Sequence, residues 1–385
     1  MIRPDYRGGG LVNLMASVIQ ARGGRAEYQQ LGLLPAPELG DARHVALLVI
    51  DGLGDDWLCR HSADGLLVRH RLGAMTTVFP ATTASAITSY LTGDAPQQHG
   101  LTGWFMWLRE LGCVMTVLPG TPRFGGVGYG KAGIDLDRLF GHRSTFARVG
   151  GRSAVISPRQ IARSDYNLAH LGPAELRDFD GLKGLVRQTA RVLRKARSPT
   201  FLYAYWPGLD SIGHEHGIES VAASEHLAKI EEAIARLKDA LAETDTALII
   251  AADHGQIDTT PADLTDLSEH PVLSDCLRIP LCGEPRAAFC YVRPDRVSTF
   301  ERYCVDVLGD CFELHHSQDL IDAGFYGLGK PHPRLAERVG DYTLLARGHH
   351  VIRDSMPFEE PSKQVGVHGG LTASEMQVPV CLLRC

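Results

Sequence analysis

The sequence lacks any CxxC pair, although it contains nine cysteines among its 385 residues. The cysteine count is odd, and the cysteines are scattered along the chain. A disulfide-stapled small domain normally has an even, closely spaced set, and a thiolate zinc site needs paired cysteines. The cysteine pattern therefore argues against both of these protein classes.

Long apolar runs and basic blocks are also missing. No apolar stretch approaches the roughly 20 residues needed to cross a bilayer, and no apolar core of a secretory signal follows Met1–Arg7. The formal net charge is -6 without a lysine/arginine cluster, which disfavours duplex nucleic acid and anionic membranes as partners. We therefore expect a cytoplasmic protein that acts on a small molecule.

What the sequence does contain is a series of buried-strand patterns that alternate with helical ones. Apolar runs cover 45–50, 201–206 and 247–252, and apolar residues recur at helical spacing between 227 and 241. This alternation predicts an α/β fold, a doubly wound, mostly parallel sheet with helices on both faces.

The alternation weakens between residues 257 and 352. We expect a strand at 287–292 and a helix at 298–308 there. We interpret 257–352 as a small α+β cap inserted into a core formed by 1–256 and 353–385. Residues 101–120 are predicted to form a loop that, together with this cap, decides the substrate.

Acidic and histidine residues follow several of the predicted strands. They are Asp51, Asp210 with His214, Asp253 with His254, and His368. Strand carboxyl ends gather at one edge of a parallel sheet, so these side chains can converge. Carboxylate and imidazole ligands suit zinc, with manganese or iron as alternatives. Six ligands are too many for one catalytic zinc but fit two metal centres, an arrangement suited to phosphoryl transfer.

A hydroxyl group is expected at the start of a helix between 74 and 93. Pro80 ends a strand, Thr82 or Thr83 can cap the following helix, and Gly93 ends that helix. A helix N-terminus favours anions, and metal coordination can activate a threonine hydroxyl as a nucleophile.

In this order along the chain, these motifs resemble the alkaline phosphatase superfamily, and most closely its type I phosphodiesterase/nucleotide pyrophosphatase branch. The motifs are Asp51-Gly52, Phe79-Pro80-Ala81-Thr82-Thr83, Leu91-Thr92-Gly93, His99-Gly100, Asp210 to Gly217, Asp253-His254-Gly255 and His368-Gly369-Gly370. The resemblance covers about 44–255 and 365–384. It implies an alkaline-phosphatase-like core and hydrolysis of phosphate esters.

The resemblance also implies roles for single residues. Asp210, His214 and His368 would bind one divalent ion, and Asp51, Asp253 and His254 the other together with the nucleophile. The family's usual offset of nine residues before Thr92 points to Thr83, with Thr82 as the alternative. The common phosphodiesterase form, with the nucleophile just before Phe-Pro, would instead point to Thr77 or Val78, and Val78 has no hydroxyl.

One departure concerns the substrate. The branch commonly carries an Asn shortly after the His-Gly step, whereas His99-Gly100 is followed here by Leu101 to Trp104 without Asn. We expect a two-metal phosphodiesterase acting through a phospho-threonine intermediate. The alternatives are a phosphomonoesterase, a phosphonate or sulfate-ester hydrolase, or a non-catalytic metal-binding protein on a degenerate hydrolase fold.

Overall fold

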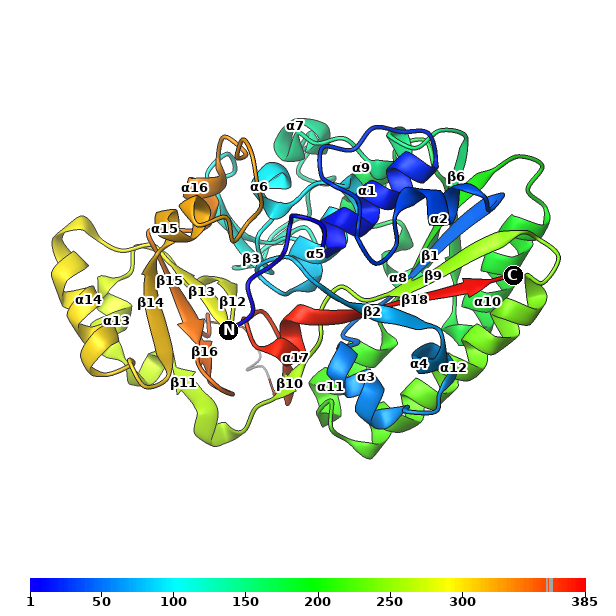
Figure 1. Cartoon of the computed structure of the whole chain (residues 1–385). Coiled ribbons are helices and arrows are strands. Elements are labelled where there is room, and N and C mark those ends of the chain that lie inside the picture. The colour runs from blue at the N-terminus through cyan, green and yellow to red at the C-terminus, as the bar shows by residue number, and fades with distance from the viewer. Residues whose placement is uncertain (358, 360–362) are drawn as a thin grey trace.

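The computed structural model describes residues 1–357, 359 and 363–385, and it is built around two seven-stranded sheets (Figure 1). The first sheet has the order β2-β18-β9-β1-β8-β6-β7. Its strands are β1 (His44–Ile50), β2 (Arg71–Thr76), β6 (Arg152–Pro158), β7 (Glu175–Phe179), β8 (Thr200–Trp206), β9 (Thr246–Ala251) and β18 (Gln377–Arg384). Strand β18 pairs antiparallel with β2 and β9, and the other pairs are parallel. The predicted mostly parallel sheet is confirmed.

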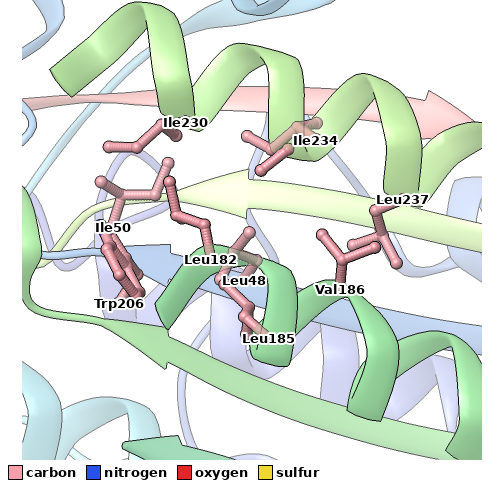
Figure 2. A pocket seen from close by; sticks show the side chains of 10 residues that line it. Leu48, Ile50, Leu182, Leu185, Val186, Trp206, Ile230, Ile234 and Leu237 are labelled. Atoms are coloured by element: carbon pink, nitrogen blue, oxygen red, sulfur yellow. The ribbon is translucent and has the colours of Figure 1, made fainter. Parts of the chain in front are cut away.

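Helices cover both faces of this sheet. On one face, α10 (Gly181–Arg194) and α12 (Val221–Ala240) lie side by side, and their apolar side chains meet those of β1 and β8 (Figure 2). The contact joins Leu182, Leu185 and Val186 of α10 and Ile230, Ile234 and Leu237 of α12 to Leu48, Ile50 and Trp206. Helices α1 (Leu11–Ala21) and α5 (Thr83–Thr92) lie on the other face (Figure 1). Every residue of β1 is buried, as its continuous apolar run predicts.

The remaining helices of this part are short. They are α2 (Ala36–Gly40), α3 (Asp55–His61), α4 (Leu66–Arg69), α6 (Pro96–His99), α7 (Leu136–Phe140), α8 (Arg159–Ala162), α9 (Asp165–Leu171), α11 (Gly208–His216) and α17 (Ala373–Met376). Within the described ranges, no helix combines the length and apolar character that a membrane span requires.

The second sheet is antiparallel and has the order β14-β15-β13-β12-β3-β4-β5. Its strands are β3 (Phe105–Leu108), β4 (Cys113–Thr116), β5 (Thr121–Pro122), β12 (Cys282–Glu284), β13 (Ala287–Cys290), β14 (Phe312–His316) and β15 (Tyr342–Ala346). Helices α13 (Pro271–Cys276), α14 (Val297–Asp306), α15 (Ser317–Asp322) and α16 (Leu335–Arg338) belong to the same part of the chain. Two short pairs complete the fold, β10 (Ile257–Asp258) with β17 (Gly366–Val367) and β11 (Leu264–Asp266) with β16 (Val351–Arg353).

The prediction of a loop over residues 101–120 is wrong, because that stretch contains β3 and β4. Each of these strands has only four residues. The residues of β3 are all apolar, so no alternation of apolar and polar residues marks it in the sequence. Strand β3 joins the second sheet where Phe105 pairs with Gly283. The second sheet therefore extends beyond 257–352 and takes in strands from the first half of the chain.

Candidate active site

Asp51, Asp253 and His254 meet at the carboxyl ends of the central strands. Asp51 directly follows β1, and Asp253 and His254 come just after its neighbour β9. His254 Nε2 lies 3.3 Å from Asp51 Oδ1 and 3.6 Å from Asp253 Oδ2. All three side chains are buried, and their ligand atoms lie within 4.8 Å of one another. They have the spacing of a metal-binding group.

The turn after β1 depends on a glycine. Gly52 has a φ of 77°, and a Cβ atom at this position would lie 3.0 Å from Asp210 Cα. A side chain there would be strained by the backbone conformation and would press on Asp210. The backbone N–H of Gly52 also donates to Asp253 Oδ1 at 3.2 Å. This glycine therefore allows the turn to approach both of the other site carboxylates.

Asp210, His214 and His368 form a second group beside the first. Asp210 and His214 lie one turn apart on α11, with 3.2 Å between Asp210 Oδ2 and His214 Nε2. His368 Nε2 is 3.9 Å from Asp210 Oδ1, and its ring stacks on that of His254 with centroids 3.8 Å apart.

The close set in this second group is Asp210, His254 and His368, so His254 belongs to both groups. His214 lies outside this close set, although it contacts Asp210, and its side chain is only half-buried. Its Nδ1 lies 2.7 Å from the carbonyl oxygen of Gly366, and this contact leaves Nε2 directed at Asp210. The structure thus brings all six predicted ligands to one place, with His254 between the two groups.

The site holds three buried carboxylates close together, and a bound cation would stabilise their charged forms. Burial raises the pKa of Asp51 well above its usual range, and the neighbouring Asp253 and Asp210 raise it further. Burial likewise raises the pKa of Asp253, although His254 opposes this. The pKa of Asp210 is lowered despite burial, because His214 and His368 lie beside it. Two of the three carboxylates are therefore held in an environment that disfavours their charged form.

The same residues fit bound divalent cations. Asp51 Oδ1 and Asp253 Oδ2 are buried and accept no hydrogen bond from the described part of the chain. Buried oxygens of this kind are costly unless a partner satisfies them. Carboxylate and imidazole donors are ligands that zinc accepts, so the unsatisfied oxygens, the mutual repulsion and the donor chemistry all agree with a metal site.

Of the three candidate threonines, only Thr83 faces the metal-binding groups. Thr83 Oγ1 lies 3.1 Å from His254 Nε2, and the side chain is partly exposed at the first residue of α5. Thr82 is buried and donates to Glu284 Oε1 at 2.6 Å. Thr77 is buried and donates to the carbonyl oxygen of Asp253. Thr82 and Thr77 therefore have their hydroxyl groups committed elsewhere.

Three further residues support the site and were not predicted. Tyr205 donates its hydroxyl hydrogen to Asp51 Oδ2, and Gln256 donates to the side chain of Asp210. Glu284 reaches the site from the second sheet. Tyr205 and Gln256 sit next to predicted motifs, in the strand before Pro207 and directly after Asp253-His254-Gly255. No local pattern marks Glu284.

The His99-Gly100 step is structural. His99 is fully buried, and its Nε2 lies 3.1 Å from Ser89 Oγ inside the fold. The Thr102 hydroxyl is also buried, with no hydrogen-bond partner among the described residues. Trp104, by contrast, is 37% exposed, and its backbone N–H donates to Glu284 Oε1 at 2.7 Å.

Comparisons with known proteins agree with this geometry. A family model described as type I phosphodiesterase/nucleotide pyrophosphatase matches residues 45–300. No curated protein gives a significant match.

Among solved structures, human ectonucleotide pyrophosphatase/phosphodiesterase 5 is similar at 16% identity, over 88% of this chain and 87% of that chain, with a TM-score of 0.66. The murine protein is similar at 15% identity over 87% of each chain, with a TM-score of 0.64. Its inactive threonine-to-alanine variant, in complex with AMP, matches at 15% identity over 87% of each chain with a TM-score of 0.63.

The structural likeness establishes the alkaline-phosphatase-like fold, as the sequence predicted. The family model spans more than half of the chain and includes five of the six predicted metal ligands together with Thr83. The chain therefore belongs to the type I phosphodiesterase/nucleotide pyrophosphatase family and is a hydrolase of phosphoric esters.

Proposed function

We propose that the protein is a two-metal phosphodiesterase that acts through a covalent phospho-Thr83 intermediate. The observation that carries this proposal is the 3.1 Å contact between Thr83 Oγ1 and His254 Nε2. It places a hydroxyl at a helix N-terminus against a cluster of buried carboxylates and imidazoles. Family membership supports the reaction class, and it speaks against the alternative of a non-catalytic binding protein.

Two divalent cations would be held by the two residue groups, with zinc the first candidate and manganese or iron the alternatives. Asp51, Asp253 and His254 would hold one, and Asp210, His214 and His368 the other. When bound, such ions lower the pKa of an attacking hydroxyl or water and offset charge on the phosphoryl oxygens. Tyr205 and Gln256 would orient Asp51 and Asp210 as ligands.

In the first half-reaction, the Thr83 hydroxyl gives its proton to solvent as its oxygen bonds to phosphorus, the bond from phosphorus to the leaving oxygen breaks, and the leaving alkoxide takes up a proton from solvent. In the second, the oxygen of a water molecule bonds to the same phosphorus, the bond to Thr83 breaks, and one proton of that water passes to the threonine oxygen. Helix α5 contributes its N-terminal N–H groups, which favour the phosphoryl oxygens. Thr82, the N-cap residue, leaves these groups open because its side chain makes no capping bond.

We assign diesters as the preferred substrates, with nucleotide-type phosphodiesters as the first class to examine. The murine relative was solved with AMP, and this supports a nucleotide-like group in that protein. Phosphomonoesters, phosphonates and sulfate esters are the alternatives for the same site.

The test is hydrolysis of bis(p-nitrophenyl) phosphate by Thr83→Ala, with metal content measured on the same sample. We expect Thr83→Ala to lose activity while it keeps its metals, and Thr83→Ser to recover part of the activity. The matched control is Thr299→Ala, which changes an exposed threonine on α14. Full activity of Thr83→Ala with full metal content would exclude the covalent mechanism.

A further inference from the structure

Glu284 is a buried carboxylate that the second sheet delivers to the active site. It ends β12, pairs with Ala287 at the start of β13, and is 6% exposed. Gly369, next to the predicted ligand His368, packs against it so closely that a Cβ atom on Gly369 would lie 2.7 Å from Glu284 Cβ. The hairpin tip therefore lies against the loop that carries His368.

Among the described residues, the carboxylate of Glu284 accepts two hydrogen bonds, and both come from segments that shape the site. Its Oε1 atom accepts from the Thr82 hydroxyl at 2.6 Å and from the backbone N–H of Trp104 at 2.7 Å. Thr82 immediately precedes the proposed nucleophile Thr83. Within the described part of the chain, no hydrogen bond reaches the second oxygen, Oε2.

Glu284 forms no ion pair among the described residues. Burial raises its pKa to about 7 and the nearby Asp210 adds to this rise, whereas the hydrogen bonds from Thr82 and Trp104 and the neighbouring His214 lower it. Arg286 is only two residues away, but its guanidinium group is bound to Glu375 at 2.7 Å and to two carbonyl oxygens. A buried carboxylate without a paired cation is costly, and such a cost is typical of functional sites.

We propose that Glu284 is a specificity-determining residue, whose carboxylate disfavours doubly charged phosphoryl groups and so directs the site towards singly charged diesters. The inference rests on the proposed function, because it assumes that the phosphoryl group binds beside Thr83. A monoester carries one more negative charge than a diester at the same phosphorus. Repulsion by Glu284 therefore raises the free energy of the bound monoester more than that of the bound diester.

The test compares kcat/KM for p-nitrophenyl phosphate and bis(p-nitrophenyl) phosphate in wild type and Glu284→Gln, on the alkaline side of the Glu284 pKa. Glutamine keeps a carbonyl oxygen for Thr82 and Trp104 but removes the charge. We expect the monoester-to-diester ratio of kcat/KM to rise about tenfold, as befits removal of one like charge from a partly buried site. A residue that only braces the fold would lower both values together and leave the ratio unchanged.

The matched control is Glu313→Gln in β14 of the same sheet, where the carboxylate lies 2.8 Å from Arg347; its ratio should equal that of wild type. If Glu284→Gln folds poorly, Thr82→Val/Glu284→Met removes the Thr82 donor together with the carboxylate and leaves only the backbone N–H of Trp104 without its acceptor; it should raise the ratio in the same direction. An unchanged ratio in the folded variant, with diester turnover still dependent on Thr83, overturns the role of Glu284 and leaves the proposed function standing. Diester turnover that survives in Thr83→Ala overturns both.

Discussion

The two sheets make different contributions to one site. The first sheet supplies the proposed ligands Asp51, Asp253 and His254 from the ends of long, buried, parallel strands. Among the residues that the structure describes, the second sheet supplies no member of the two metal-binding groups. It contributes Glu284, and Trp104 lies just before the first residue of its strand β3.

The first sheet therefore holds proposed metal ligands, whereas the second sheet contributes residues that would influence substrate preference. Parallel strands fix their carboxyl ends rigidly beside one another, which suits the precise placement that a metal pair needs. The antiparallel second sheet has short strands and approaches the site through a hairpin tip and one strand start. Substitutions in the first sheet should therefore abolish turnover, whereas those in the second should change stability or substrate preference.

The largest effect is expected for Asp253→Asn, which weakens a buried ligand after β9. We expect kcat/KM for the diester to fall by at least ~10³-fold, because several kcal/mol of charge stabilisation depend on this ligand. The melting temperature of metal-depleted protein should rise, since one of the repelling carboxylates is gone. The control is Asp64→Asn, which changes an exposed aspartate. Unimpaired turnover of Asp253→Asn would show that the Asp253 carboxylate is not needed for catalysis.

An intermediate effect is expected for Arg286→Met in the hairpin of the second sheet. Arg286 and Glu375 form a fully buried ion pair at 2.7 Å, and Glu375 also accepts from the backbone N–H of Gly370 at 2.7 Å. Breaking a buried pair leaves an uncompensated charge, so the free energy of unfolding should fall by about 3–5 kcal/mol in urea titrations.

Two comparison variants sharpen this prediction. The double variant Arg286→Met/Glu375→Leu should recover part of the lost stability, because no buried charge is left alone, although the backbone N–H of Gly370 loses its acceptor. Arg347→Ala, which breaks the half-exposed pair with Glu313 in the same sheet, should change the free energy of unfolding by less than about 1 kcal/mol. Equal losses for Arg286→Met and Arg347→Ala would contradict the prediction that the buried pair costs more to break than the half-exposed one.

The smallest effect is expected for Tyr205→Phe in β8. The Tyr205 hydroxyl donates to Asp51 Oδ2, and loss of such a partner typically weakens metal affinity by about 10–100-fold. Competition with a chromophoric chelator measures this affinity. Tyr291→Phe, which removes a hydroxyl bound to the Glu337 carbonyl oxygen instead, should leave metal affinity at the wild-type value. A Tyr205→Phe affinity equal to wild type would show that Asp51 is oriented without this hydrogen bond.

Much of the first sheet could be predicted because its signals are local. The apolar run before Asp51 and the one before Asp253 are long enough to identify buried strands, and both became central parallel strands. The helix from Thr83 to Thr92, with Gly93 left-handed at its end, was likewise visible from its capping residues. Strands β3 and β4 were missed, because four residues do not establish a period.

The sequence by itself determined the strand ends, the acids and histidines on them, and the helix that begins beside the two threonines. These depend on apolar periodicity and on residues that end strands or cap helices, which act over a few neighbours. Only the tertiary structure decided that Thr83 faces His254 while Thr82 turns to Glu284, and that His254 lies between both ligand groups. Thr82 and Glu284 are 202 residues apart in the chain, and a contact over that separation arises from packing between sheets, which no local pattern encodes.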